Sequence, residues 1–276
     1  MTMHNQWEAM CASGFKQVSH STFRRYSSDS EVSIHELRAC IYSDIHLLGC
    51  ESATLYADLL TVTSFVDLSS HTVQSPGWNL VEEELHKEGH FILRSDQFPH
   101  SQTTDGHFTV TMPRLKVNAS PGWLAIESLE PARFSSPWRL YLPGITLSNF
   151  STLIAFMDRQ DYLHQWSMKT SLSQNQNLTL IPRPDATVIY FDPAQARGGA
   201  IRALVNAINL FAPTGRGPGF SVQLTDSVWV GGPSTNAHTS FGSGLSVVAA
   251  QCLIANDFTE LNHREATFWK EINALV

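Results

Sequence analysis

Apolar residues recur at helical spacing in one stretch near the start of the chain. The segment from Ser33 to Leu48 is followed by Gly49, a residue type that commonly ends helices. Its apolar side chains repeat every three to four residues, at Ile34, Leu37, Ile41, Ile45 and Leu48. The pattern therefore predicts a helix over residues 33–48. From residue 64 to 101 the pattern is mixed and contains turn residues, so we expect a boundary near residue 100.

Beyond residue 100 the pattern changes to a period of two. Alternation from His107 to Met112 predicts a half-buried strand that Pro113 ends. Further strands are expected at residues 123–129, 138–142, 166–172, 186–191, 220–224 and 228–230. Helices are expected at residues 147–163, 200–211, 245–254 and about 261–275.

This order of elements favours an α+β fold, with mainly antiparallel sheets packed by helices, over a regular βαβ series. We expect residues 1–100 to form a mostly helical N-terminal region and residues 101–276 an α+β domain, and one continuous domain is an open alternative. The 276 residues are 42% hydrophobic and 16% charged, a balance that supports a sizeable buried core.

The charge distribution argues against nucleic acid as a partner. The formal net charge is −7, and the 18 Lys and Arg residues are scattered without forming a basic block. Proteins that bind a phosphate backbone usually present a basic patch or stripe. The nearest approach is the pair Arg24 and Arg25, which we interpret as a solvated loop.

Cysteine usage and hydropathy bear on the compartment. Cys11, Cys40, Cys50 and Cys252 show no C-x-x-C spacing and suggest a reducing compartment. The first residues lack the basic region and apolar run of a signal peptide, and no stretch reaches the ~18 apolar residues of a membrane span. We therefore expect a cytoplasmic protein that does not engage a membrane. Export by a route that leaves no such signal, including delivery into a host cell by a secretion system, is the alternative.

Two predicted strands place polar residues opposite apolar ones. Arg139 and Tyr141 point away from their apolar neighbours in residues 138–142, as do Ser167, Lys169 and Ser171 in residues 166–172. His107 begins a similar face in the strand after residue 106. If these faces adjoin, a cation, a general acid and hydroxyl donors share one groove. The alternative is that they form the solvated side of an antiparallel sheet.

Arg183 and Asp185 stand at the mouth of a predicted buried strand. A guanidinium offers bidentate, permanently charged donors that suit a phosphate or carboxylate ligand. An ion pair between these two residues explains the same pattern equally well. The sequence shows no spacing typical of a metal site, and residues 215–219 lack the Lys-Ser/Thr of a phosphate-binding loop, so we expect neither metal nor cofactor.

The motifs from Arg139 onward, taken in order, are similar to those of one known family. They are Arg139-Leu140-Tyr141-Leu142 before a helix, Trp166-Ser167-Met168-Lys169-Thr170, Arg183-x-Asp185-Ala186-Thr187-Val188-Ile189-Tyr190, and Thr239-Ser240-Phe241-Gly242 opening a helix. In order and spacing they resemble the Hop-A family of type III effectors and its phospholyase relatives. The likeness covers about half of the chain.

The resemblance implies a carbon–oxygen lyase that works beside a separate kinase-like protein. Relatives occur as effectors of plant pathogens and in gene clusters for lanthipeptides and thioamide peptides. There, the kinase phosphorylates Ser or Thr of a precursor peptide with a leader, and the lyase eliminates phosphate to leave a dehydroamino acid. Phosphothreonine lyase effectors run a similar elimination. After Gly242, where the family pattern leads us to expect a basic residue, this chain has Ser243.

Such a β-elimination needs a base for the Cα proton, cations for the phosphate and an acid for the leaving oxygen. An ordinary lysine has a pKa of about 10.4, so a lysine base must have its pKa lowered by burial or by neighbouring arginines. By this resemblance we assign Lys169 as base, His107 as acid with His238 as second choice, Arg139 and Arg183 as phosphate clamps, Arg114 as a weaker third, and Tyr141 or Tyr190 as supporting donors. The alternative function is a non-catalytic binding protein, either an effector that engages a host protein or a subunit that binds the leader peptide and the kinase.

Overall fold

The computed structural model describes most of the chain. The described residues are 5–50, 55–56, 72–87, 91–97, 99–120, 122–128, 137–146, 149–163, 165–174, 183–195, 199–233 and 240–275. Helices pack on antiparallel sheets, so the expected α+β fold is confirmed. No helix among these residues is both long and apolar enough to cross a membrane.

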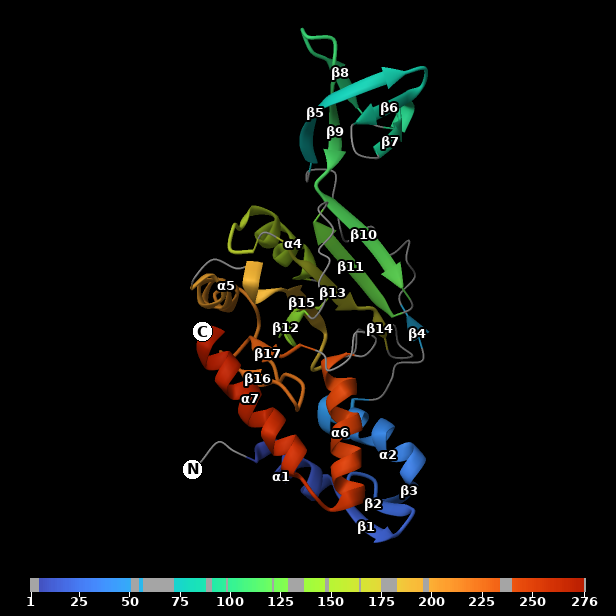
Figure 1. Ribbon diagram of the computed structural model, residues 1–276, viewed down its shortest axis with the longest axis vertical. Helices are drawn as coiled ribbons and strands as arrows, with labels where there is room; N and C mark the ends of the chain where they lie inside the picture. The colour runs from blue at the N-terminus through green and yellow to red at the C-terminus, as the bar shows by residue number, and fades with distance from the viewer. Residues whose placement is uncertain are drawn as a thin grey trace.

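A seven-stranded antiparallel sheet lies at the centre of the molecule (Figure 1). Its strands, in spatial order, are β10 (Leu115–Ser120), β11 (Trp123–Ser128), β13 (Ser167–Ser171), β15 (Thr187–Phe191), β12 (Trp138–Tyr141), β17 (Trp229–Gly231) and β16 (Val222–Gln223). The period-two segments beyond residue 107 thus become strands, and all but the first of them join this sheet. The strand β10 was not predicted.

Two helices cover one face of this sheet. The helices α4 (Phe150–Arg159) and α5 (Ala200–Asn209) lie on the same side of it in Figure 1. Their buried side chains belong to one hydrophobic core with alternate residues of the strands, among them Ile126, Met168 and Leu140. Because side chains alternate along a strand, the residues directly before and after each of these three point to the opposite face. The short 3-10 turn η4 (Pro193–Gln195) precedes α5.

The N-terminal segment packs against the C-terminal helices at one end of the molecule. It comprises α1 (Gln6–Gly14), the hairpin strands β1 (Phe15–Ser19), β2 (Thr22–Arg25) and β3 (Ser30–Ser33), the helix α2 (Ile34–Ile41) and a π-helical turn η1 (Tyr42–His46). The helices α6 (Phe241–Ala255) and α7 (Thr259–Leu275) lie beside it (Figure 1). The buried carboxylate of Glu265 in α7 accepts hydrogen bonds from the backbone N–H groups of Gln6 and Trp7, at 3.2 and 3.0 Å.

Local sequence explains where these helices begin. Ser33 and Glu36 form a capping box at the start of α2, in which the Ser33 N–H donates to Glu36 Oε2 at 3.0 Å. Ser240 caps α6 by accepting a hydrogen bond from the Ser243 N–H at 3.2 Å. The helix predicted over residues 33–48 is therefore present, although its last turn widens into η1.

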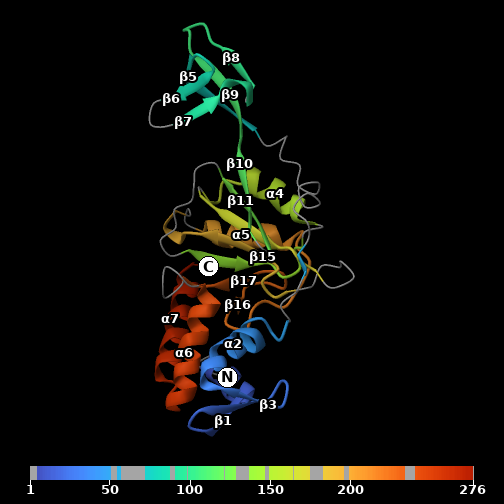
Figure 2. The same cartoon turned by 90° about the vertical axis from the view of Figure 1, so that its right-hand side faces the viewer.

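A second, smaller sheet projects from the opposite end of the molecule (Figures 1 and 2). Its strands, in spatial order, are β7 (Phe91–Arg94), β6 (Glu84–Lys87), β5 (Thr72–Val81), β9 (Phe108–Pro113) and β8 (His100–Gln102), with the 3-10 turn η2 (Ser95–Gln97) after β7. Trp78, Leu85 and Val110 form a hydrophobic cluster separate from the main core. A two-stranded pair, β4 (Leu55–Tyr56) with β14 (Ser173–Gln174), completes the strands.

Residues 1–100, expected to be mostly helical, thus contain both helices and strands. The expected boundary near residue 100 falls inside the smaller sheet, at the start of β8. The main core contains residues from Trp7 to Ile272, so it draws on both expected regions.

Candidate functional site

The face of the central sheet opposite α4 and α5 presents a row of cations and aromatic rings. Strand pairing aligns Ser167 of β13 with Tyr190 of β15, and Tyr190 with Arg139 of β12. Residues two apart on a strand share a face, so Lys169 lies on the same face as Ser167. The alternation of polar and apolar residues in the sequence correctly predicts this common face.

Ring contacts fix the order of the side chains. Lys169 Nζ lies 3.9 Å from the centre of the Trp123 ring and 5.7 Å from that of Tyr190. The guanidinium carbon of Arg183 lies 5.5 Å from the Trp123 ring, and that of Arg139 lies 5.4 Å from the Tyr190 ring. We call these five residues, Arg183, Trp123, Lys169, Tyr190 and Arg139, the cation–aromatic row. Cations within about 6 Å of an aromatic face are attracted to it.

The two arginines of the row also bind within the protein. Arg183 forms a bidentate pair with the buried Asp185, from Nε at 2.9 Å and from its terminal nitrogen at 3.3 Å. This confirms the ion pair that the sequence left open. Arg139 is only 6% exposed, and one of its terminal nitrogens donates to the carbonyl oxygens of Pro137 and Gly232, at 3.1 and 3.0 Å. Both guanidiniums are therefore held in place.

Lys169 of the row is partly accessible. It is half-buried between two aromatic rings, and its strand neighbours Ala125 and Val188 are small or apolar. Glu127 also lies on this face, opposite Ser167 at the far end of β11. The row has three cations, one of them paired with Asp185, in a chain with a formal net charge of −7.

Two residues of η1 lie within electrostatic reach of the row. Tyr42 stands within electrostatic reach of Asp185, Arg183 and Tyr190 and forms a hydrogen bond with the Ser240 side chain; burial raises its pKa to about 12. The His46 ring lies 5.2 Å from that of Tyr42 and stacks on Phe220 at 6.0 Å. Burial lowers the pKa of His46 to about 4, and its Nδ1 has no hydrogen-bond partner among the described residues. His46 is therefore a neutral imidazole at neutral pH.

The two predicted tyrosines differ in accessibility. Tyr190 is half-buried within the row, whereas Tyr141 is 3% exposed and packs against His46 with ring centres 6.1 Å apart. Burial raises the pKa of Tyr141. Its hydroxyl consequently stays protonated and can only donate or accept a hydrogen bond.

The structure brings together Lys169, Arg139, Arg183, Tyr141 and Tyr190, but not His107 or Arg114. His107 lies just before β9 of the smaller sheet, exposed, with Nδ1 2.9 Å from Asn79 Oδ1. Arg114 pairs with Asp158 at 3.3 Å, away from the row. His238 lies outside the described residues.

Sequence reasoning overlooked Trp123, Tyr42 and His46. Trp123 begins a predicted strand, and its alternation with Ala125 and Glu127 places it on the polar face. Tyr42 and His46 are four residues apart in the predicted helix, beside its apolar stripe. That spacing indicates a common face, but no local signal indicates that this face packs beneath Arg183.

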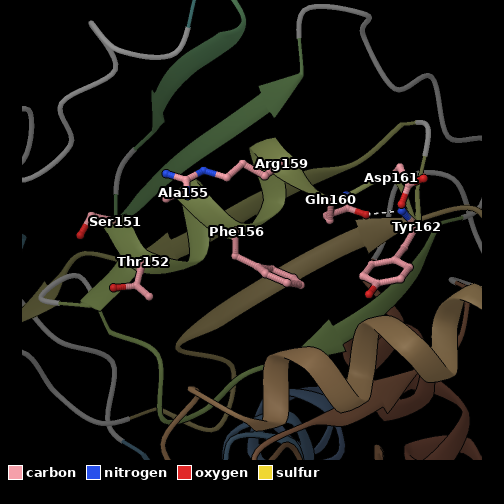
Figure 3. Close-up of a pocket in the computed structure, with 8 residues that line it drawn as sticks. All are labelled: Ser151, Thr152, Ala155, Phe156, Arg159, Gln160, Asp161 and Tyr162. Carbon is pink, nitrogen blue, oxygen red and sulfur yellow. Dashed lines mark hydrogen bonds between the residues drawn. The ribbon is translucent and has the colours of Figure 1, made fainter.

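One pocket lies beside Tyr42, and another lies along α4. One, of about 500 Å³, is lined by His35, Arg38, Ala39, Tyr42 and Ser243, and it adjoins the row at Tyr42. Another, of about 730 Å³, runs along α4 and the turn after it (Figure 3). Figure 3 shows Arg159 and Tyr162 at this second pocket, and none of its lining residues belongs to the row. In the described part of the chain, no group of three or more His, Cys, Asp or Glu residues gathers as a metal site would require.

The chain matches none of the protein-family models and none of the curated proteins searched.

Proposed function

We propose that this protein is a phosphoserine/phosphothreonine lyase. It eliminates phosphate from a precursor peptide that a separate kinase has phosphorylated, and leaves a dehydroamino acid of the kind found in lanthipeptides and thioamide peptides. The observation that supports this is the cation–aromatic row, which gathers Lys169 with Arg139 and Arg183 on one face of the central sheet. We further propose that the reaction takes place in the bacterial cytoplasm, with delivery into a host cell as the alternative.

In the proposed reaction, neutral Lys169 removes the proton from Cα of the phosphorylated residue. The electron pair of the Cα–H bond becomes the second bond between Cα and Cβ, and the Cβ–O bond breaks with its electrons on the leaving oxygen. The ester reacts as its monoanion, so phosphate leaves as HPO4²⁻ and the Cα proton stays on Lys169 as its ammonium. Fixed cations stabilise the charge that develops on the leaving phosphate, because they need no reorganisation during the step. Arg139 and Arg183 are held by backbone carbonyls and by Asp185, which suits this task.

A non-catalytic binding protein is the second candidate, and the contact between Lys169 and Trp123 favours it. An aromatic face attracts the charged ammonium and not the neutral amine. A lysine that stays charged binds a phosphate well but cannot accept a proton. On this reading the row recognises a phosphorylated or otherwise acidic segment of a host protein or of a peptide with a leader.

Substitutions at Lys169 separate the two candidates. A synthetic peptide library with a central phosphoserine or phosphothreonine is incubated with the protein, and mass spectrometry follows loss of one phosphoric acid. Lys169→Arg keeps the cation but removes the base, so the lyase should lose about 100-fold or more in rate while it still binds phosphopeptide. Lys169→Ala should lose both properties. Lys270→Ala, an exposed lysine on α7, is the control for loss of one charge.

Each candidate has an outcome that contradicts it. Elimination at the wild-type rate in Lys169→Ala excludes Lys169 as the base. No elimination by the wild-type protein, with the row still binding phosphopeptide, supports the binding protein. No binding and no elimination removes both.

A further inference from the structure

The pocket between α2 and α6 is lined by groups that donate hydrogen bonds to anions. Its lining residues His35, Arg38, Tyr42 and Ser243 include one guanidinium, one imidazole and two hydroxyls. Its volume of about 500 Å³ is within the range of small-ligand sites, which is roughly 300–1,000 Å³. The pocket therefore has both the space and the chemistry for a phosphoryl group.

Arg38 is the central group of this pocket. It is exposed on α2, and one of its terminal nitrogens donates to the hydroxyl of Ser243 in α6 at 2.9 Å. That bond uses one of five N–H donors of a guanidinium. Position 243 of α6 is a serine and not a cation, and Arg38 of α2 places its charge beside that serine.

Several hydrogen-bond donors of the row's two arginines are already used within the protein. Arg183 is already paired with Asp185, and Arg139 is buried with one nitrogen bound to two carbonyls. A phosphate dianion near the row would have to share these donors with their internal partners. Arg38 is exposed and its described partner is a neutral hydroxyl, so it can approach an anion at little cost.

Tyr42 connects the pocket with the row. Its side chain lines the pocket, forms a hydrogen bond with Ser240 and stands within electrostatic reach of Arg183 and Tyr190. Tyr190 in turn contacts Lys169.

We propose that this pocket is the phosphoryl-group subsite of the protein, with Arg38, Tyr42, His35 and Ser243 as its donors. The inference rests on the proposed function for its choice of ligand, a phosphate monoester. The phosphoryl group lies against Arg38 and Tyr42, and Arg183 of the row is within electrostatic reach of Tyr42. Tyr42 keeps its proton throughout and donates a hydrogen bond.

Inorganic phosphate is a suitable probe because the protein cannot consume it. Phosphorus NMR titrations at constant ionic strength give its affinity for the wild-type protein and for Arg38→Gln, Tyr42→Phe and Arg202→Gln. Arg38→Gln should weaken phosphate binding about tenfold or more, and Tyr42→Phe several-fold, because hydrogen bonds to charged groups are lost. Arg202 is exposed on α5, so Arg202→Gln removes the same charge elsewhere and should leave the affinity unchanged.

The outcomes separate the subsite from the proposed lyase. Phosphate affinity that is unchanged in Arg38→Gln, or lowered equally in Arg202→Gln, overturns the subsite even if the protein eliminates phosphate from peptides. Affinity that depends on Arg38 and Tyr42, in a protein without elimination activity, supports the subsite and contradicts the lyase. Thermal unfolding of each variant identifies any that fail to fold; Arg38→Gln is the decisive one, because its side chain lies outside the core.

Discussion

His46 is a buried imidazole among aromatic rings. It is 3% exposed, contacts Tyr42, Tyr141 and Phe220, and lies within reach of the charges of Asp185, Arg139 and Arg183. Desolvation is the largest of these influences and disfavours the charged ring. Protonation of His46, which lies near the row but is not part of it, therefore changes the free energy of unfolding.

This coupling predicts acid sensitivity. The pKa of His46 falls from 6.5 to about 4 on folding, so the unfolded chain takes up the proton first as the pH decreases. Its contribution to stability is complete above about pH 6.5 and is lost as the pH falls toward 4, at a cost of about 2–3 kcal/mol by pH 4.5. Urea unfolding of wild-type and His46→Gln proteins between pH 7 and 4.5 measures the difference.

The expected result is a smaller decrease for His46→Gln over this range, whatever its stability at pH 7. His263→Gln, an exposed substitution on α7, controls for the loss of one histidine. Parallel curves for His46→Gln and the wild-type protein would show that His46 does not titrate on unfolding in this window.

At this scale the sequence predicts which residues meet when they share a strand face. Lys169, Arg139 and Tyr190 gather because alternation fixes their side and the strands pair within one sheet. His107 alternates in the same way, but its strand pairs with β5 and β8 in the smaller sheet. Alternation assigns a face and does not identify the sheet, so the separation of His107 from Lys169 was not predictable.

The contact between η1 and α6 joins the N-terminal segment to the helix beside the row. Gly242, in the first turn of α6, lies directly against the His46 ring, and a β-carbon there would overlap the imidazole. The glycine is required for close approach and not for its backbone angles. The motif residue Gly242 thus has a structural reason that sequence alone does not reveal.

Gly242→Ala should therefore be strongly coupled to His46. Overpacking at this contact should lower the free energy of unfolding by about 1–3 kcal/mol. In the double variant Gly242→Ala/His46→Ala, removal of the ring makes room for the added methyl group. The stability cost of Gly242→Ala should then shrink, which a double-mutant cycle from urea unfolding measures.

Gly14→Ala is the matched control for this cycle. A β-carbon at Gly14 would meet Ile45 Cδ1 at 3.8 Å, an ordinary contact, and alanine favours helices. This variant should be as stable as the wild-type protein or more so. Additive costs for Gly242→Ala and His46→Ala would mean that the helix shifts as a whole and does not press on the ring.

Element prediction succeeds where one side of a segment is continuously buried. The helix α5 buries Ile201, Leu204, Val205 and Ile208 on one face, and its residues repeat at the period expected. By contrast, β1 has one buried residue followed by four exposed ones, so it has no alternation to detect. Strand pairing determines such elements, and pairing is not a local property.

At the scale of the whole molecule, two cores divide the chain. Among the residues that the structure describes, the main core includes residues from both chain ends but none from Leu47 to Arg114, whereas Trp78, Leu85 and Val110 form a separate cluster. Composition cannot predict this second core, because the smaller sheet is an internal segment of the chain whose two ends lie next to each other. Thr72 and Pro113 pair across β5 and β9, which shows that the sheet leaves and rejoins the body at adjacent points.

The smaller sheet should therefore be removable. Replacing residues 73–112 with a short Gly/Ser linker joins two positions that already pair, and it leaves every residue of the main core in place. The unfolding free energy of the rest of the protein should change by less than about 1 kcal/mol, which corresponds to a shift of about 2–4 °C in Tm for a domain of this size.

The deletion also removes His107 and keeps Lys169, Arg139 and Arg183. If the row and the pocket at Arg38 suffice, elimination from the phosphopeptide library continues at a similar rate. A tenfold or larger decrease, in a variant that melts like the full chain, would instead indicate that His107 or another part of the smaller sheet takes part in the reaction. His107→Gln in the full chain then decides between these two.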